Sequence, residues 1–277
     1  DKIGNNNWAK SNIEYCIDWK VRVLRNDDVF YEHDFNPFGK RVFISMGSKA
    51  LGDTLAWFPY FEEFRKKHNC ELIVSTFHNN MFEEQYPHFE FVKPGSTVQN
   101  LYAMYNVGLF YNDDGSVNEL KNPNDFKTQT MQKMGSDILG LEYKEIKPLL
   151  SFKNTGSTIE GDYVVIAPHG SAHAKYWNYS GGWQIIIDYL NSKGYKVVII
   201  TKEPLGDEWH DSKLGGTLTG VIDKTGDYPI ADRANDMMNA EFFIGIGSGL
   251  SWLSWALNIK TILISGFSES YSEMEGC

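Results

Sequence analysis

Asp53 is the side chain whose type and position most clearly suggest chemistry. It follows an apolar run of β-formers at residues 42–44 and a glycine-bearing turn at residues 47–52, and it opens a stretch with helically spaced aromatic residues. In an open α/β sheet, such a turn lies at the carboxyl edge of the strands, where ligands bind. A carboxylate at that edge, beside a flexible backbone, is suited to act as a general base.

Two other interpretations of Asp53 compete with this one. Its carboxylate could only cap the helix, where it meets free amides and the helix dipole. Residues 47–54 also match the phosphate-loop pattern G-x-x-x-x-G-K-[ST], except that Asp53 replaces the lysine. Because a carboxylate would repel phosphates, a nucleotide-hydrolysing loop is disfavoured. The turn also fails the G-x-G-x-x-G spacing of a dinucleotide site.

A second group of chemistry-bearing residues follows the first apolar strand of the second half. Gly170 and Ser171 offer close backbone approach and a hydroxyl group, and Lys175 adds a cation. These are parts from which a diphosphate site can be built. His169 and His173 have the spacing of a metal pair, but the glycine between them and the lack of nearby carboxylates disfavour a metal site.

Two further loops follow apolar strands in the second half. Thr201 and Lys202 come directly after one such strand, at an edge where they could contact a ligand or form only a surface turn. The other loop contains, in order, Ser248, Gly249, Leu250 and Ser251. It opens a helix whose free amides would point at an anion. A tight strand–helix junction that needs small residues for packing is the alternative.

The elements that must position these residues alternate along the chain. Strands are predicted at residues 42–44, 71–76, 89–92, 107–111, 163–167, 196–200, 219–222, 242–246 and 261–264, and helices from residue 53 through the aromatic residues at 57–64 and at 79–86, 128–139, 182–192, 230–238 and 251–257. This alternation predicts an α/β fold with parallel sheets covered by helices. The polar, glycine-bearing stretch 152–161 marks a domain boundary, which divides the chain into residues 1–152 and 153–277. Residues 1–40 are predicted to form a β-rich segment before the first α/β domain, and its sequence does not indicate a function.

Composition narrows the class of protein. Hydrophobic residues make up 42% and charged residues 22% of the chain, as in ordinary soluble globular proteins. The net charge of −10 argues against nucleic acid as a partner. The scattered cysteines Cys16, Cys70 and Cys277 indicate a reducing compartment rather than a disulfide framework. The sequence contains neither an apolar run near the ~20 residues of a membrane span nor a signal-like start, so we expect a cytoplasmic protein.

The residues around Asp53 carry a family resemblance. Gly52-Asp53-Thr54-Leu55, with Pro59 inside the following helix, resembles the amino-terminal motif of the ADP-heptose heptosyltransferases of glycosyltransferase family nine. The sequence of residues 50–57 is most similar to that of the autotransporter heptosyltransferase branch. The resemblance implies that Asp53 is the base that deprotonates an acceptor hydroxyl, with Gly52 and Thr54 beside it at the substrate.

The resemblance continues in the second half. Ser171, Lys175 and Trp177 match, in order and spacing, the family's loop around the nucleotide diphosphate. The stretch 247–252 also resembles the family, although Gly247 replaces an acidic residue that is thought to contact the donor sugar, and Trp252 replaces a histidine. The sequence Gly-Ser-Gly-Leu-Ser-Trp in this stretch is again similar to the autotransporter branch.

What the resemblance implies is a GT-B fold, in which two facing Rossmann-like domains with parallel sheets carry the acceptor and the nucleotide sugar. The expected activity is transfer of a sugar, heptose, from an ADP-sugar donor to a hydroxyl of a protein or glycan acceptor. No cofactor is expected, because Lys175 and helix amides near Gly249 would stabilise the leaving diphosphate. A sugar-nucleotide epimerase of the same architecture and a non-catalytic nucleotide- or carbohydrate-binding module are the alternatives.

The carboxyl end predicts a longer chain. GT-B folds finish with a helix that crosses back to the first domain, and residues 265–277 are too short and polar to supply it. The autotransporter branch has a cysteine-ligated iron site near its carboxyl end, to which Cys277 would contribute one ligand in a longer chain. Because tetrahedral sites of this kind need four ligands, a free terminal thiol is the alternative for this chain.

Overall fold

A computed structural model describes residues 2–266, 268–269 and 271–274, and its contacts divide them into two compact units. Unit 1 consists of the described residues within 1–48, 57–79 and 87–144. Unit 2 consists of those within 49–56, 80–86 and 145–277. The predicted division into residues 1–152 and 153–277 has one boundary, whereas unit 2 also includes two short segments of the first half, residues 49–56 with Asp53 and residues 80–86.

Unit 1 is built on a parallel sheet with the strand order β5-β4-β3-β6. Its strands are β3 (Arg41–Met46), β4 (Glu71–Ser75), β5 (Glu90–Phe91) and β6 (Ala103–Val107). The strand predicted at residues 107–111 is wrong, because β6 ends where that prediction begins. As an edge strand, β6 alternates buried Tyr105 and Val107 with exposed neighbours and so lacks a continuous apolar run.

The residues before this sheet form an antiparallel hairpin of β1 (Lys20–Arg25) and β2 (Asp28–Asp34). The β-rich character predicted for residues 1–40 agrees with this hairpin. Unit 1 also contains a pocket between the hairpin's flanking segments and β6, described below with the candidate sites.

Two consecutive helices follow β3 because proline interrupts what the spacing predicts as one. Helix α1 (Leu51–Trp57) ends just before Pro59, which lacks a backbone N–H and begins α2 (Pro59–His68). The chain passes from unit 2 to unit 1 at this break. The remaining helices of unit 1 are η2 (Phe126–Thr128) and α3 (Met131–Ile138), with the 3-10 turn η1 (Asn79–Met81) reaching into unit 2. The helices predicted at 79–86 and 128–139 are therefore shorter in the structure.

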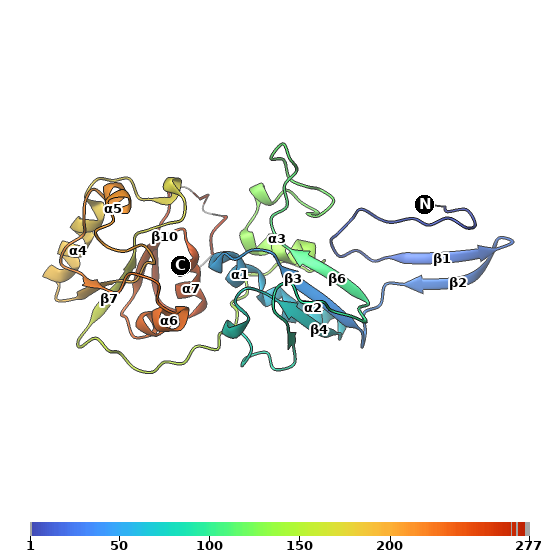
Figure 1. The fold of residues 1–277 in the computed structure, drawn as a ribbon, viewed down its shortest axis with the longest axis horizontal. Helices are drawn as coiled ribbons and strands as arrows, with labels where there is room; N and C mark the ends of the chain where they lie inside the picture. Colours follow the sequence, from blue (N-terminus) through green and yellow to red (C-terminus); the bar gives the residue numbers. More distant parts are fainter. Residues whose placement is uncertain (1, 267, 270, 275–277) are drawn as a thin grey trace. The chain divides into compact units, whose positions relative to one another are not determined.

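Unit 2 is built on a second parallel sheet, with the strand order β11-β10-β7-β8-β9. Its strands β7 and β10 are labelled in Figure 1. The strands are β7 (Tyr163–Ala167), β8 (Lys196–Ile199), β9 (Ile222–Asp223), β10 (Phe243–Ile246) and β11 (Thr261–Ile264). The chain runs outward from β7 through β8 to β9, and then returns to place β10 on the other side of β7. The loops after β7 and β10 therefore leave the sheet in opposite directions, which makes a topological switch point between them.

Four α-helices connect the strands of unit 2: α4 (Gly182–Ser192), α5 (Glu208–Leu214), α6 (Ile230–Met238) and α7 (Gly249–Ala256). The sequence patterns predicted all of them except the short α5. Helix α4 is amphipathic, so Trp183 and Ile187 are fully buried against β7 and β8 while Ile185 is 58% exposed. Among the described residues, no helix of either unit is both long and apolar enough to cross a bilayer.

Burial on α4 predicts unequal costs for two chemically identical truncations. Ile187→Ala removes a fully buried side chain from the core of unit 2 and should lower the free energy of unfolding by about 2–5 kcal/mol. Ile185→Ala, on the exposed face of the same helix, should change it by roughly 0.5 kcal/mol or less. Urea unfolding followed by circular dichroism measures both, and equal costs would contradict the packing described here.

Candidate active site

The loop after β7 packs against the end of β10 through a buried glycine. A Cβ atom at Gly170 would lie 2.9 Å from the Cδ1 atom of Ile246 and 3.2 Å from the Cβ atom of Lys175. A side chain at Gly170 would therefore force the end of the Ile246 side chain and the Cβ atom of Lys175 to shift. Absence of a side chain lets the backbone of the β7 loop reach the switch point, where ligands bind in sheets of this type.

The remaining predicted residues of the β7 loop divide into two kinds. Ser171 is exposed and Lys175 is half-buried, so both have atoms that a ligand can reach. Trp177 instead packs within the unit: its ring stacks on Tyr179 at 5.8 Å, and its edge lies 2.6 Å from the Cβ position of Gly182 at the start of α4. Trp177 thus anchors the loop that carries the other two.

A buried histidine ties the β7 loop to the β8 loop. The Nδ1 atom of His169 lies 2.7 Å from the hydroxyl of Thr201, and that hydroxyl also donates to the backbone oxygen of Glu203 at 3.3 Å. Burial lowers the pKa of His169 to about 4, against a smaller opposing effect of the Glu203 carboxylate. His169 is therefore neutral at pH 7, and its Nε2 atom is buried without a hydrogen-bond partner in the described part of the chain.

The structure distinguishes the residues of these two loops that are held inside the protein from those that are exposed. The Thr201 hydroxyl is engaged inside the protein, whereas Lys202 is exposed and forms an ion pair with Asp227 at 3.5 Å. His169 and His173 do not form a metal pair, since one is buried and the other exposed. No metal-binding group of three or more His, Cys, Asp or Glu side chains occurs among the residues the structure describes.

The start of α7 contributes a helix N-terminus to the same sheet edge. The backbone oxygen of Ser248 accepts hydrogen bonds from the amides of Ser251, at 3.1 Å, and Trp252, at 3.3 Å. The amides of Gly249 and Leu250 belong to the first turn, whose N–H groups have no intrahelical acceptor. The hydroxyl of Ser248 is buried and has no hydrogen-bond partner in the described residues.

Ser251 plays the packing role that was the alternative for this loop. Its buried hydroxyl donates to the backbone oxygen of Ile246 at 2.6 Å and so fastens the first turn of α7 to β10. Within the loop, Ser248, Gly249 and Leu250 are half-buried. The junction is thus tight at Ser251, while its preceding residues retain atoms that a ligand can reach.

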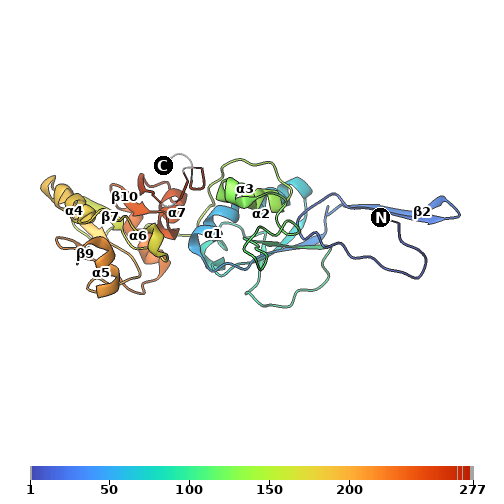
Figure 2. The same ribbon diagram turned by 90° about the horizontal axis from the view of Figure 1, so that it is seen from above.

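Helix α1 lies against helix α7 within unit 2, through two glycines (Figures 1 and 2). A Cβ atom at Gly249 would lie 2.9 Å from the Cβ atom of Leu51 and 3.2 Å from the backbone nitrogen of Gly52. A Cβ atom at Gly52 would lie 3.1 Å from the ring of Trp252. The half-buried Asp53, which follows Gly52, is thereby brought to the start of α7.

Thr54 fixes the turn that carries this carboxylate. Its buried hydroxyl donates to the backbone oxygen of Ala50 at 3.0 Å, and its backbone nitrogen donates to the same oxygen at 3.2 Å. Thr54 is therefore a structural neighbour of Asp53, and its hydroxyl is engaged within the helix.

A carboxylate that sequence analysis missed lies at the end of β10. The Oε1 atom of Glu273 lies 2.5 Å from the position that a Cβ atom would occupy at Gly247, and the hydroxyl of Ser268 lies 3.3 Å from it. Gly247 is the position where the family pattern has an acidic residue. The glycine at this position could have indicated that space is open here, but the sequence does not reveal which distant carboxylate fills it.

The structure has one pocket beside the β7 loop and another in unit 1. In unit 2, a pocket of about 410 Å³ is lined by residues of the β7 loop and α5, namely His173, Ala174, Tyr176, Asn178, Ser180, Ser212, Lys213 and Gly215. The hydroxyl of Tyr176 forms a 2.7 Å hydrogen bond with His210 beside it. This pocket shares the β7 loop with the candidate site, but Ser171 and Lys175 are not among the residues that line it.

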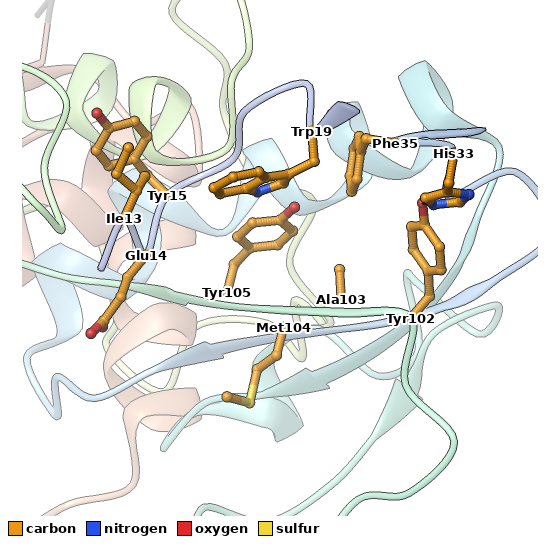
Figure 3. Close-up of a pocket in the computed structure, with 10 residues that line it drawn as sticks. All are labelled: Ile13, Glu14, Tyr15, Trp19, His33, Phe35, Tyr102, Ala103, Met104 and Tyr105. Atoms are coloured by element: carbon orange, nitrogen blue, oxygen red, sulfur yellow. The ribbon is translucent and has the colours of Figure 1, made fainter. Parts of the chain in front are cut away.

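The other pocket, of about 320 Å³, lies in unit 1 and contains none of the predicted site residues (Figure 3). Aromatic rings from the segments flanking the hairpin and from β6 line most of it, including Trp19, Phe35, Tyr102 and Tyr105. His33 closes one end through a 2.9 Å hydrogen bond to the hydroxyl of Tyr102.

The switch point of the second parallel sheet thus carries close-packed glycines, a lysine and a helix N-terminus, at the kind of sheet edge where α/β proteins bind ligands. The family model for glycosyltransferase family 9 (heptosyltransferase) matches residues 115–270. The chain belongs to glycosyltransferase family 9, which confirms the family resemblance read from the motifs.

The relatives fall within one branch of this family. The autotransporter heptosyltransferase BAHTCr of Citrobacter rodentium is 35% identical over 97% of the chain, and the chain spans 65% of that relative's length. A relative from Burkholderia thailandensis, 28% identical over 88% of the chain and 57% of its own length, is described as the inactive autotransporter heptosyltransferase BimC. Similarity to this branch therefore does not by itself guarantee turnover.

Solved structures of TibC from enterotoxigenic E. coli H10407 have the same fold. One, described as a bacterial iron-containing dodecameric glycosyltransferase, is 33% identical, with a TM-score of 0.85 over 96% of this chain and 69% of TibC. Another, an iron-containing TibC in complex with ADP-D-beta-D-heptose, is 32% identical, with a TM-score of 0.84 over 98% of this chain and 73% of TibC. The predicted α/β fold with parallel sheets is confirmed at this level.

The TibC structures correct the expectation that no cofactor is involved, because both are described as iron-containing. The described residues do not fit an iron centre, because they contain no group of three or more His, Cys, Asp or Glu side chains that could hold a metal ion. Cys277, to which an iron ligand role was assigned by resemblance, lies outside the described residues.

The neutral state of His169 predicts a pH-dependent stability. Its folded pKa of about 4 lies below the ordinary value of 6.5, so the unfolded chain binds more protons between these two values. Its contribution is therefore complete above pH 6.5 and is lost as the pH falls towards 4, by up to about 3 kcal/mol. Thermal unfolding between pH 7 and pH 4 should show a smaller loss for His169→Gln than for the wild type; parallel curves would contradict this assignment.

Proposed function

We propose that the protein is a heptosyltransferase that transfers heptose from ADP-heptose to a hydroxyl group of an acceptor. Membership of glycosyltransferase family 9 supports this proposal, as does the complex of TibC with ADP-D-beta-D-heptose. Heptosyltransferase relatives favour transfer over epimerisation or simple binding. The chain spans 65% of the length of BAHTCr, so the activity is stated here as a proposal and tested below.

The observation that carries the proposal is the contact between α1 and α7. Close packing of Gly52 on Trp252, and of Gly249 on Leu51, brings the turn with Asp53 to the helix start beside the diphosphate loops. A glycosyl transfer needs both parts near one another, since the base acts on the attacking hydroxyl while the diphosphate departs from the same carbon.

The proposed reaction is a single displacement at the anomeric carbon of the donor. The acceptor oxygen forms a bond to this carbon while the bond between the carbon and the diphosphate oxygen breaks, and its electron pair leaves with ADP. Asp53 accepts the proton of the acceptor hydroxyl. Lys175, Ser171 and the first amides of α7 stabilise the negative charge that develops on the diphosphate.

The larger setting is also part of the proposal. We infer a GT-B arrangement in which residues 1–152 form the acceptor side and residues 153–277 bind the nucleotide sugar, with Thr201 and Lys202 at the edge near the base or ribose. Names of the autotransporter relatives favour a polypeptide acceptor over a glycan. The few, scattered cysteines support a cytoplasmic location.

The base assignment predicts a large rate effect with little effect on nucleotide binding. Asp53→Asn keeps the shape of the side chain but removes its basicity, so transfer should fall by about 10²–10⁴-fold while ADP affinity stays within roughly twofold. Glu208→Gln, which removes an exposed carboxylate from the first turn of α5, is the matched control and should leave both unchanged. Transfer assays and ADP calorimetry decide the matter; near-normal turnover of Asp53→Asn would contradict the assignment.

The diphosphate assignment predicts the opposite balance for Lys175→Ala. Loss of a charge-assisted hydrogen bond of about 1.5–3 kcal/mol should weaken ADP binding by roughly 10- to 100-fold. Lys193→Ala, which removes an exposed lysine just after α4, should bind ADP normally. If calorimetry gave both variants the affinity of the wild type, the diphosphate would have to bind elsewhere.

A further inference from the structure

Glu273 occupies the space of a missing side chain at the switch point. Gly247 directly follows β10, and the Oε1 atom of Glu273 lies 2.5 Å from the position of a Cβ atom there, with the Cδ atom at 3.5 Å. Because Gly247 has no side chain, the carboxylate of Glu273 reaches the backbone at the carboxyl edge of the sheet. A side chain of its own at position 247 would displace it.

The segment after β11 holds this carboxylate in place. Strands β10 and β11 are parallel neighbours, so the chain leaves both at the same sheet edge. Two hydrogen bonds fold the described residues beyond β11 at this edge. The hydroxyl of Ser265 donates to the backbone oxygen of Ser268 at 3.2 Å, and the backbone N–H of Ser272 donates to the backbone oxygen of Glu269 at 2.9 Å. Met274, next to Glu273, is 6% exposed and fixes the segment by burial.

The location of the carboxylate relates it to the donor sugar rather than to the nucleotide. This step rests on the proposed function, in which the diphosphate meets the first amides of α7 and the acceptor approaches from Asp53. The sugar must then lie between these groups, beside the residues that lead into α7. Gly247 is two residues before Gly249, the helix start that packs on α1.

We propose that Glu273 binds the hydroxyl groups of the donor sugar and helps to select the sugar. An ionised carboxylate only accepts hydrogen bonds, and adjacent sugar hydroxyls can both donate to it. The same negative charge would disfavour a close approach of the diphosphate oxygens, so the side chain distinguishes the sugar end of the donor from its phosphate end.

The test compares two ligands that differ only in the sugar. Calorimetry measures the affinities of the wild type, Glu273→Gln and the control Glu269→Gln for ADP and for ADP-heptose. Glu269 is an exposed carboxylate of the same segment. For Glu273→Gln we expect ADP-heptose affinity to fall by about 10- to 100-fold with ADP affinity within twofold, and for Glu269→Gln we expect no change in either.

The other outcomes overturn the assignment in distinguishable ways. Equal losses for ADP and ADP-heptose would mean that Glu273 only shapes the loop, and unchanged affinities would mean that it does not contact the donor. If the wild type bound ADP but showed no additional affinity or turnover with ADP-heptose, the proposed function itself would fail, irrespective of Glu273.

A compensating variant checks that the carboxylate acts at this position. Glu273→Ala should lose the preference for ADP-heptose over ADP, and adding Gly247→Asp should restore part of it, because the new carboxylate starts from the backbone position that Glu273 now covers. Gly247 does not have a left-handed backbone conformation, and once Glu273 is truncated a side chain there needs only a small shift of the Ser268 hydroxyl, which lies 3.3 Å from the Cβ position. A double variant that folds like the wild type by circular dichroism yet recovers no preference would overturn the assignment.

Discussion

The candidate site depends on the close approach of two helix starts, each of which carries a glycine. A Cβ atom at Gly249 would lie 2.9 Å from the Cβ atom of Leu51, too close without a shift, and a Cβ atom at Gly52 would press on the ring of Trp252 at 3.1 Å. The contact places α1, which begins after a strand of the first sheet, in the compact unit built around the second. The turn that carries Asp53 therefore lies beside the start of α7, although the two are almost two hundred residues apart in the sequence.

The second sheet supplies the other half of the site through its strand order. Returning to β10 beside β7 creates a switch point, and the buried Gly170 lets the loop after β7 close onto the end of β10. Neutral His169 then joins this loop to Thr201 of the next one. Burying a neutral ring costs far less than burying a charge, so the two loops are fixed to each other without an ion pair beneath the proposed diphosphate site.

Small and hydroxyl-bearing residues in these motifs serve two different purposes. The hydroxyls of Thr54 and Ser251 are buried and bonded to backbone oxygens, so they hold the turns in shape. Ser171 and Lys175, by contrast, remain within reach of a ligand. A motif match therefore identifies a set of positions, within which the scaffold residues and the ligand-contacting residues differ in burial and in hydrogen bonding.

Local sequence determined most of the strands and helices, the parallel α/β class and the positions of Asp53 and Lys175, because hydrophobic periodicity and glycine turns act over a few residues. It missed α5 and misplaced β6, where a short helix and an alternating edge strand leave weak patterns. Only the tertiary structure decided that residues 49–56 join the second unit and that Glu273 fills the space over Gly247. These contacts join distant segments through shape and the absence of side chains, and no local pattern encodes which distant partner fills such a space.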